Sequence, residues 1–302
     1  MAELAADELT HALAPRRRTW PGTLGLLSGP LLWLVVFFLL PIVIVGAYSV
    51  GALSLLPSDV PGGLEIWRRF LSGQSIYLGL FWKSVRMALT ASVIVVLLAY
   101  PIAYFLALCV KKRKYVLLLL VIAPFLTSYL LRVLAWKVIL GDRGVINSLL
   151  YFVHLRQPDH PISWLLYSQF AVILVLSYVW VPFVALPIFV SLDNLDRSIL
   201  EAANDLGASR WKVFWRVTFR LSLPGVIAAF VFVFIPTLGE FVTPLLVGGT
   251  SGFMYGNAIS DLFTQGLDWR TGSVLAIFLL GVVALLLALF GRFLQVRRIG
   301  AA

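Results

Sequence analysis

Long apolar runs separated by polar segments dominate the pattern of this chain. A helix needs about 20 apolar residues to cross the hydrocarbon core of a bilayer. Six runs meet that length, at about 24–50, 84–110, 115–140, 164–191, 222–246 and 273–295. The pattern therefore predicts an all-α integral membrane protein with six transmembrane helices. We expect one membrane domain over 24–298, preceded by a disordered tail over 1–23.

The fifth apolar run has an irregular end. Pro236, Gly239 and Pro244 fall close together there, and such residues break or kink a helix. Membranes tolerate a broken helix only where protein or water covers the freed backbone groups. We therefore expect the outer end of this span to be buried in protein or to line a cavity.

The composition agrees with a membrane protein. The chain has 302 residues, of which 61% are hydrophobic and 13% charged, and this excludes an ordinary soluble globular protein. Its one cysteine, Cys109, excludes an internal disulfide and a cysteine-rich metal site. The net charge of +10 reflects basic loops rather than a nucleic-acid partner, so we expect membrane lipid and no nucleic acid around it.

Basic residues predict the orientation of the spans. Lys and Arg collect in short segments close to the ends of the runs, where they favour the cytoplasmic side. These segments hold Arg16–Arg18, Lys111–Lys114, the basic residues of 193–221, and Arg292, Arg297 and Arg298. Both termini and the segment 193–221 are therefore predicted to be cytoplasmic. The segments 51–83, 141–163 and 247–272 are predicted to face outward.

The segment 193–221 is polar yet patterned as two helices. In "LDRSILEAANDLGA" an apolar face repeats at helical spacing, through Leu195, Ile199, Ala202 and Leu206. Gly207 follows and can end that helix in a backbone conformation with positive φ. Ser209 stands where it can cap a second helix, "RWKVFWRVTFR".

The second helix has two unlike sides. Its less polar side is Trp211, Phe214, Trp215 and Thr218, and its basic side is Arg210, Lys212, Arg216 and Arg220. One interpretation is a helix that lies in the interface and extends its basic side chains toward lipid headgroups. The other is a docking surface for a soluble cytoplasmic partner.

The residues Glu201-Ala202-Ala203, followed by three residues and then Gly207, resemble the EAA loop of permease subunits in bacterial ATP-binding-cassette importers. The resemblance implies the type I importer permease fold, with a cytoplasmic helix-Gly-helix coupling loop that inserts into a groove of an ATPase subunit. It implies that the contact is made by Glu201, Ala202, Ala203, Asp205, Gly207, Arg210 and Trp211. Arg220 stands where the family pattern has proline, which leaves the entry into the fifth span open.

Three further stretches resemble the permease subunits of spermidine/putrescine importers. They are "FWKSVRMALTASVIVVLLAYPIAYFLA", "SYLLRVLAWKVILGDRGVINSLL" and "FIPTLGEFVTPLLVGG", and the resemblance covers most of 80–290. It implies half of a translocation pathway for a small solute, a polyamine or alternatively another organic cation, an opine or ferric iron. It also implies a bacterial inner membrane and three partners: a cytoplasmic ATPase dimer, a second homologous permease and an extracytoplasmic substrate-binding protein.

The chain lacks the sequence of a phosphate-binding loop. No G-x-x-x-x-G-K-[ST] occurs, and none of the six lysines follows a glycine. We therefore expect no enzyme activity and no cofactor in this chain, with ATP and Mg bound by the partner ATPase. No catalytic or metal site is expected either. The rival class, an ion-coupled secondary transporter, predicts inverted repeats and acidic residues near the midplane, and neither is evident.

Ionisable residues within the runs are candidates for the solute pathway. On straight helices, at 1.5 Å per residue, Arg132 lies roughly 26 Å beyond Tyr115, and Glu240 lies roughly 27 Å beyond Ser222. A polyamine path would offer carboxylates and aromatic faces. The candidates are Glu240, Arg132, Trp136, Tyr129, Asp261 and Asp268. Alternatively, Arg132 extends outward to the interface, or Glu240 pairs with it.

Overall fold

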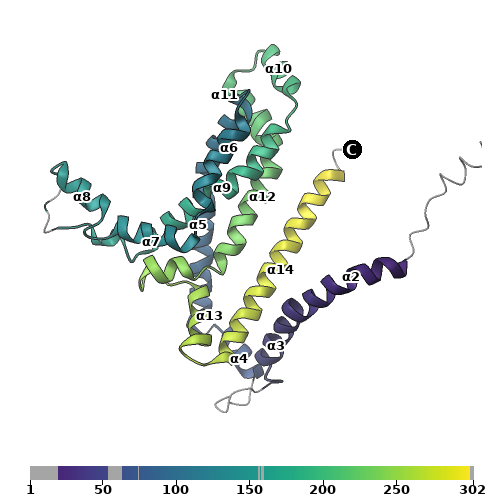
Figure 1. The fold of residues 1–302 in the computed structure, drawn as a ribbon, viewed down its shortest axis with the longest axis vertical. Helices are drawn as coiled ribbons and strands as arrows, with labels where there is room; N and C mark the ends of the chain where they lie inside the picture. The colour runs from purple at the N-terminus through teal and green to yellow at the C-terminus, as the bar shows by residue number, and fades with distance from the viewer. Residues whose placement is uncertain (1–19, 54–62, 74, 156, 158–159, 300–302) are drawn as a thin grey trace, which may run out of the picture.

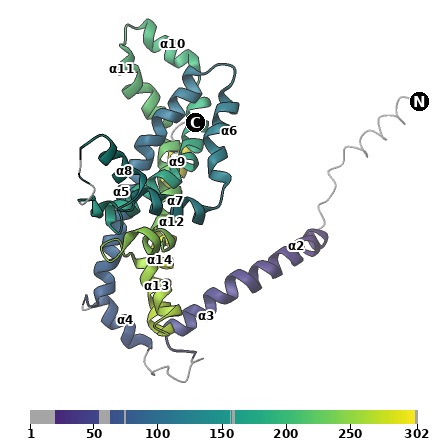
Figure 2. The same ribbon diagram turned by 60° about the vertical axis from the view of Figure 1, so that its left-hand side comes forward.

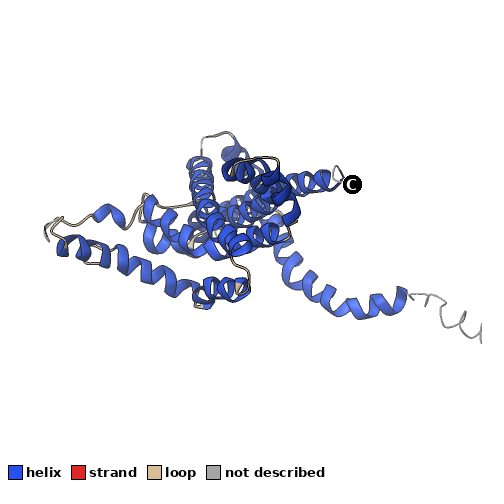
Figure 3. Cartoon of the chain, turned by 90° about the horizontal axis from the view of Figure 1, so that it is seen from above, coloured by secondary structure: helices blue, strands red, loops and turns tan. Residues whose placement is uncertain are grey.

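The structure is a computed structural model, and it describes residues 20–53, 63–73, 75–155, 157 and 160–299. Most of the predicted tail over 1–23 lies outside these residues. Figure 3 shows helices and loops, and the described residues contain no strand. The helices are α2 (Trp20–Leu34), α3 (Leu40–Ser49), α4 (Gly63–Leu71), α5 (Ile76–Tyr104), α6 (Lys114–Ile122), α7 (Tyr129–Leu140), α8 (Val145–Phe152), α9 (Gln169–Asp193), α10 (Arg197–Asp205), α11 (Arg210–Val213), α12 (Phe219–Leu238), α13 (Tyr255–Thr264) and α14 (Trp269–Ile299).

Short turns of tighter or wider helix join several of these elements. The π-helical turns are η1 (Val35–Leu39), η2 (Phe105–Cys109), η5 (Phe214–Thr218) and η6 (Pro244–Gly248), and the 3-10 turns are η3 (Ala123–Leu126) and η4 (Ser163–Leu165). Through them, consecutive helices run together as membrane spans. Five continuous spans cover Leu27–Ser49, Ile76–Cys109, Gln169–Asp193, Arg210–Leu238 and Trp269–Arg292. A bent pair of helices supplies the sixth, so the predicted six-span architecture is confirmed.

The third predicted span, 115–140, is not a straight helix. Its two parts, Lys114–Leu126 and Tyr129–Phe152, meet at a bend of 80°. Pro124 lies in the 3-10 turn η3 just before the bend, and proline cannot donate a backbone hydrogen bond there. In Figure 1, α7 and α8 form an arm that leaves the bundle to the side. The depth predicted for Arg132 is therefore wrong, because Arg132 belongs to this arm.

The fifth span begins earlier than predicted and ends earlier. The second helix of the 193–221 segment and the span form one continuous helix from Arg210 to Leu238, which includes the π-helical turn η5. The helix ends at Gly239, and the chain then turns through Glu240 into η6. The predicted break near Pro236, Gly239 and Pro244 is confirmed, whereas the span 222–246 is wrong at both ends.

The core of the bundle is made by α5, α9 and α12 packed against one another. Their contact surfaces carry fully buried small residues, including Ala99, Ala103, Ala185 and Ala229. Small side chains allow helix backbones to approach closely, which is how membrane helices gain packing energy without a hydrophobic driving force. This three-helix core carries α10 and α11 at one end.

The first span stands apart from that core. Figures 1 and 2 show α2 diverging from the bundle, while α3 packs against α14. Large apolar side chains on this span, such as Trp33 and Phe37, are exposed. In the same views α10 and α11 lie at one end of the molecule, and α4 and α13 lie at the opposite end.

Candidate coupling and solute sites

The first candidate site is the coupling unit, which we define as residues 196–218: α10, the turn after it, α11 and η5. Asp196 precedes α10, and its carboxylate accepts a hydrogen bond of 2.9 Å from the backbone N–H of Ser198. This cap satisfies a backbone donor that the first turn of a helix leaves free. The same hydrogen bond holds the pKa of Asp196 below its usual value.

Gly207 ends α10 in the predicted way. Its φ is +79°, in the left-handed region that favours glycine. The Gly207 N–H donates to the Asn204 carbonyl at 2.9 Å, and the Ala208 N–H donates to the Ala203 carbonyl at 3.2 Å. These two bonds form a Schellman motif, which satisfies carbonyls at the end of the helix. Ser209 precedes α11 as predicted, although its side chain makes no capping hydrogen bond.

Large apolar side chains project from this end of the molecule. Leu206 is 88% exposed and Trp211 is 70% exposed. The Trp211 ring lies 5.6 Å from the Trp215 ring, centroid to centroid. Of the residues that the resemblance assigned to the coupling contact, Ala203 is half-buried, and the exposed ones are Glu201, Ala202, Asp205, Gly207, Arg210 and Trp211. The unit therefore offers an apolar tip surrounded by charges of both signs.

The coupling unit is joined to the core by aromatic contacts. The Phe214 ring lies 5.9 Å from the ring of Tyr100, and Phe219 lies 5.7 Å from the same ring. The Tyr100 hydroxyl is hydrogen-bonded to the buried Ser222 hydroxyl at 3.0 Å. Arg220 is exposed on a helix that runs from the coupling unit into the fifth span without a break.

The second candidate site is the outer cluster, which lies where the arm begins. We define it as Phe125, Tyr129, Arg132, Trp136, Tyr178, Glu240 and Thr243. The hydroxyls of Tyr129 and Thr243 are hydrogen-bonded at 2.5 Å, which joins α7 to the chain after α12. The Arg132 guanidinium lies 5.1 Å from the Phe125 ring centroid, within cation–π range. The Tyr178 ring lies 5.1 Å from Phe125 and 5.4 Å from Trp136.

Glu240 occupies the turn after the fifth span. Its Oε1 accepts hydrogen bonds from the N–H groups of Val242 and Thr243, at 2.9 and 3.0 Å. The two ion pairs found among the described residues do not include Arg132 or Glu240. The predicted alternative of an Arg132–Glu240 pair is therefore wrong. In the described part of the chain, Arg132 Nε and Nη1 are buried without a hydrogen-bond partner.

Two predicted pathway residues lie away from the outer cluster. Asp268 Oδ1 accepts a hydrogen bond of 3.0 Å from the Thr271 N–H, in the first turn of α14. Asp261 is half-buried on α13, at the end of the molecule opposite the coupling unit. The structure thus brings together Tyr129, Arg132, Trp136 and Glu240 and leaves the two aspartates apart.

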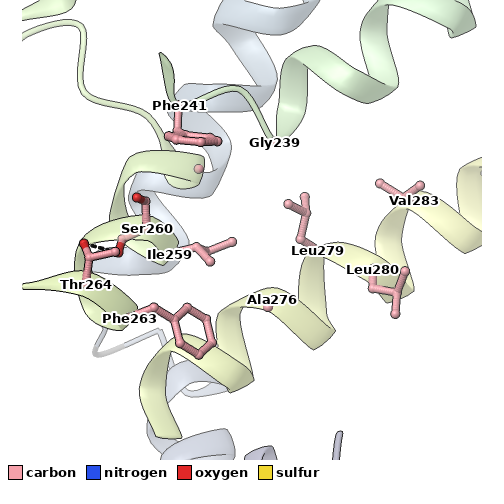
Figure 4. A pocket seen from close by; sticks show the side chains of 11 residues that line it. Gly239, Phe241, Ile259, Ser260, Phe263, Thr264, Ala276, Leu279, Leu280 and Val283 are labelled. Atoms are coloured by element: carbon pink, nitrogen blue, oxygen red, sulfur yellow. Dashed lines mark hydrogen bonds between the residues drawn. The ribbon is translucent and has the colours of Figure 1, made fainter. Parts of the chain in front are cut away.

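An apolar groove runs between α13 and α14 beside the Glu240 turn. Its volume is about 610 Å³, and Gly239 and Phe241, the neighbours of Glu240, form part of its wall. Figure 4 shows Phe263, Leu279 and Val283 around this space. Among the described residues that line it, side-chain hydroxyls belong only to Ser260 and Thr264. The groove can accommodate methylene groups but offers no charge.

Sequence reasoning missed the residues that hold the Glu240 turn in place. The side chain of buried Asn257 donates to the Phe241 carbonyl at 2.8 Å and accepts from the Met254 N–H at 3.1 Å. A Cβ on Gly256 would lie 2.5 Å from the Gly239 carbonyl oxygen, so only glycine fits there. An asparagine in an apolar stretch, directly after a glycine, was the available signal.

These features define a class of protein. A six-span helical bundle with a helix-Gly-helix unit between its fourth and fifth spans has the fold of an importer membrane subunit. A chain in the crystal structure of a bacterial alginate ABC transporter, in complex with an alginate pentasaccharide-bound periplasmic protein, has the same fold. Its TM-score is 0.62 at 20% identity, over 94% of this chain and 98% of that chain.

A family model, "Binding-protein-dependent transport system inner membrane component", matches residues 25–300, and the chain belongs to that family. It is therefore a multi-pass inner-membrane permease of an ABC importer. It is 34% identical to the spermidine/putrescine permease protein PotB of Escherichia coli K12, over 86% of this chain and 93% of that protein. PotB of Haemophilus influenzae is also 34% identical, over 86% of this chain and 90% of that protein.

Proposed function

We propose that this permease forms half of the translocation pathway of an ATP-driven polyamine importer. The identity to PotB proteins supports the solute class, since their name states spermidine/putrescine transport. The outer cluster supports it on chemical grounds. It combines the Glu240 carboxylate with the rings of Trp136 and Tyr178, and ammonium groups bind both kinds of group, whereas the Phe125 ring already carries the Arg132 guanidinium. The apolar groove beside Glu240 suits the methylene spacers of a polyamine.

The coupling unit is the proposed contact with a cytoplasmic ATPase dimer, which binds ATP and Mg. The observation that carries this proposal is the exposed apolar tip, Leu206 and Trp211, on a unit closed by Gly207. Such side chains are costly in water and gain most when a partner's groove buries them. The partner ATPase supplies hydrolysis, because this chain has no phosphate-binding loop.

The transport cycle then follows from rigid-body switching between two states. ATP closes the ATPase dimer, the coupling unit moves with it, and the spans change from inward-facing to outward-facing. A substrate-binding protein delivers the solute on the outer side, and a second homologous permease completes the pathway. In this proposal both termini and the coupling unit are cytoplasmic, and 24–298 is the membrane domain behind a tail at 1–23.

Reconstitution tests the function. The permease, its homologous partner, the ATPase and the binding protein are placed in proteoliposomes, and uptake of radiolabelled spermidine and putrescine is measured with and without ATP. We expect uptake that requires both ATP and binding protein. Uptake without nucleotide contradicts an ATP-driven importer. Binding-protein-dependent transport of an opine or ferric iron, but of no polyamine, contradicts the solute class.

Glu201→Lys tests the docking role of the coupling unit against the lipid interpretation. Glu201 is exposed on α10, so the substitution reverses one charge without disturbing the core. If the unit contacts an ATPase, copurification of the ATPase falls at unchanged membrane abundance. If the unit lies on anionic lipid, the added positive charge leaves the complex unchanged or strengthens membrane contact.

A further inference from the structure

An ion pair joins the start of α6 to the end of α9. Lys114 Nζ lies 2.5 Å from Asp193 Oδ1, and the Tyr115 hydroxyl donates to Asp193 Oδ2 at 3.3 Å. The side chains of Lys114 and Asp193 are 22% and 16% exposed. The other ion pair among the described residues, Glu65–Arg69 on α4, is largely exposed. Asp193 is therefore a partly desolvated carboxylate with two donors, and both donors come from α6.

The ion pair lies directly before the coupling unit in the chain. Asp193 is the last residue of α9, and Asp196, which caps α10, begins the coupling unit. The rings of Tyr115 and Phe189 also touch here, at 6.1 Å between centroids. The start of α6 is thus joined to the end of α9, directly before the coupling unit, by an ion pair, a hydrogen bond and a ring contact.

The far end of α6 leads to the outer cluster. After α6 the chain passes through η3 and the 80° bend into α7. Phe125 lies in η3, and Tyr129 and Arg132 lie in the first turn of α7. The Tyr129–Thr243 hydrogen bond then joins α7 to the Glu240 turn. The helix α6 is therefore connected to Asp193 at its start and to the outer cluster beyond its end.

We propose that Asp193 is a positioning residue that transmits displacement of the coupling unit to α6 and thereby to the outer cluster. The inference rests on the proposed function, since it assigns the connection between the two candidate sites. Apolar contacts between helices permit sliding, whereas a charge-assisted pair with two donors has a defined geometry and resists separation. When the coupling unit moves, Asp193 carries Lys114 and Tyr115 with it.

The alternative is a static contact that only holds the fold together. The two roles differ in what the loss of the Asp193 charge does. A static contact affects abundance and assembly, and uptake falls in proportion to the amount of complex. A transmitting contact affects uptake per complex, while the coupling unit still binds the ATPase and ATP is still hydrolysed.

The test uses Asp193→Asn in the reconstituted complex with radiolabelled spermidine. We expect abundance and ATPase copurification within about twofold of wild type, and uptake per complex lower by about tenfold, because the neutral amide no longer holds Lys114 and α6 no longer follows the coupling unit. ATP hydrolysis should continue with less dependence on the binding protein. The exchanged pair Lys114→Asp with Asp193→Lys should recover uptake. Glu65→Gln, which removes the exposed ion pair on α4, is the matched control and should change nothing.

Two results overturn the proposal. One is Asp193→Asn uptake per complex within about twofold of wild type. The other is a loss of abundance that accounts for the whole loss of uptake and is not restored by the exchanged pair. If Asp193→Asn does not insert, Tyr115→Phe removes one donor from the same carboxylate, and unchanged uptake then counts against the proposal. Failure of the wild-type complex to import spermidine instead contradicts the proposed function, so the two failures are distinguishable.

Discussion

Replacing Gly207 with valine should leave the permease folded and inserted in the membrane but should weaken its coupling to the ATPase. Gly207 has φ +79°, and a Cβ built there would meet no atom within 4 Å. The substitution therefore creates no clash, and its cost lies in the backbone alone. An L-residue in the left-handed region costs about 1–2 kcal/mol, and a β-branched residue is among the least suited to it.

That cost acts on the Schellman turn rather than on the bundle. If the turn opens, the hydrogen bonds from Gly207 and Ala208 to the end of α10 are lost, and α11 changes its angle to α10. A cost of about 1–2 kcal/mol lowers the population of the closed turn relative to open forms by a factor of about 5–30. Because only the closed turn fits a partner's groove, affinity for the ATPase falls with the fraction of closed turn, and so by at most the same factor.

The assay is ATPase copurification and ATP-dependent uptake at matched membrane levels. Gly207→Val should lower both strongly, while Gly207→Asn should stay near wild type, because asparagine tolerates this conformation. Gly73 provides a matched control, since it has φ +75° and equally open surroundings in the segment between α4 and α5. Gly73→Val should leave ATPase binding unchanged. Wild-type copurification and uptake for Gly207→Val would refute the reasoning.

Three further predictions concern the solute site, its packing and the topology. Glu240→Gln should lower polyamine uptake per complex by about tenfold while assembly and basal ATP hydrolysis persist, and unchanged uptake kinetics would remove Glu240 from the pathway. Gly256→Ala should destabilise the protein by about 1–3 kcal/mol, seen as reduced thermal stability in detergent, because its Cβ would clash with the backbone carbonyls of 239 and 240. In a Cys109→Ser background, an impermeant thiol reagent should label Ser148→Cys in intact cells and Ser209→Cys only after permeabilisation, and the reverse pattern would invert the orientation.

Hydropathy was sufficient to predict the helical class and six spans, because bilayer thickness alone determines the length of an apolar run. It could not predict the bend of the third span. The residues around Thr127 are as apolar as a straight span requires, and the 3-10 turn at Pro124 changes direction without changing hydropathy. The continuous helix from Arg210 to Leu238 was not predicted. The basic residues up to Arg220 led to the prediction of a separate helix that ends before the fifth span begins at 222.

The candidate sites were predictable to different degrees. The turn at Gly207 depends on neighbouring residues only, so its positive φ and the capping position of Ser209 followed from the sequence. The outer cluster joins residues far apart in the chain, such as Tyr129 and Thr243. A sequence gives the residue types but does not show which distant residues come into contact. The Lys114–Asp193 pair was missed for the same reason.

The central claim is that the coupling unit is where an ATPase binds, and site-specific photocrosslinking tests it most directly. A photoreactive amino acid replaces Leu206, whose side chain is 88% exposed at the tip of the unit. A second variant carries the same group at Leu149, an exposed position on α8. In membranes that contain the whole importer, irradiation should crosslink position 206 to the ATPase and should not crosslink position 149 to it. Labelling of lipid alone from position 206, or capture of the ATPase from position 149, would contradict the claim.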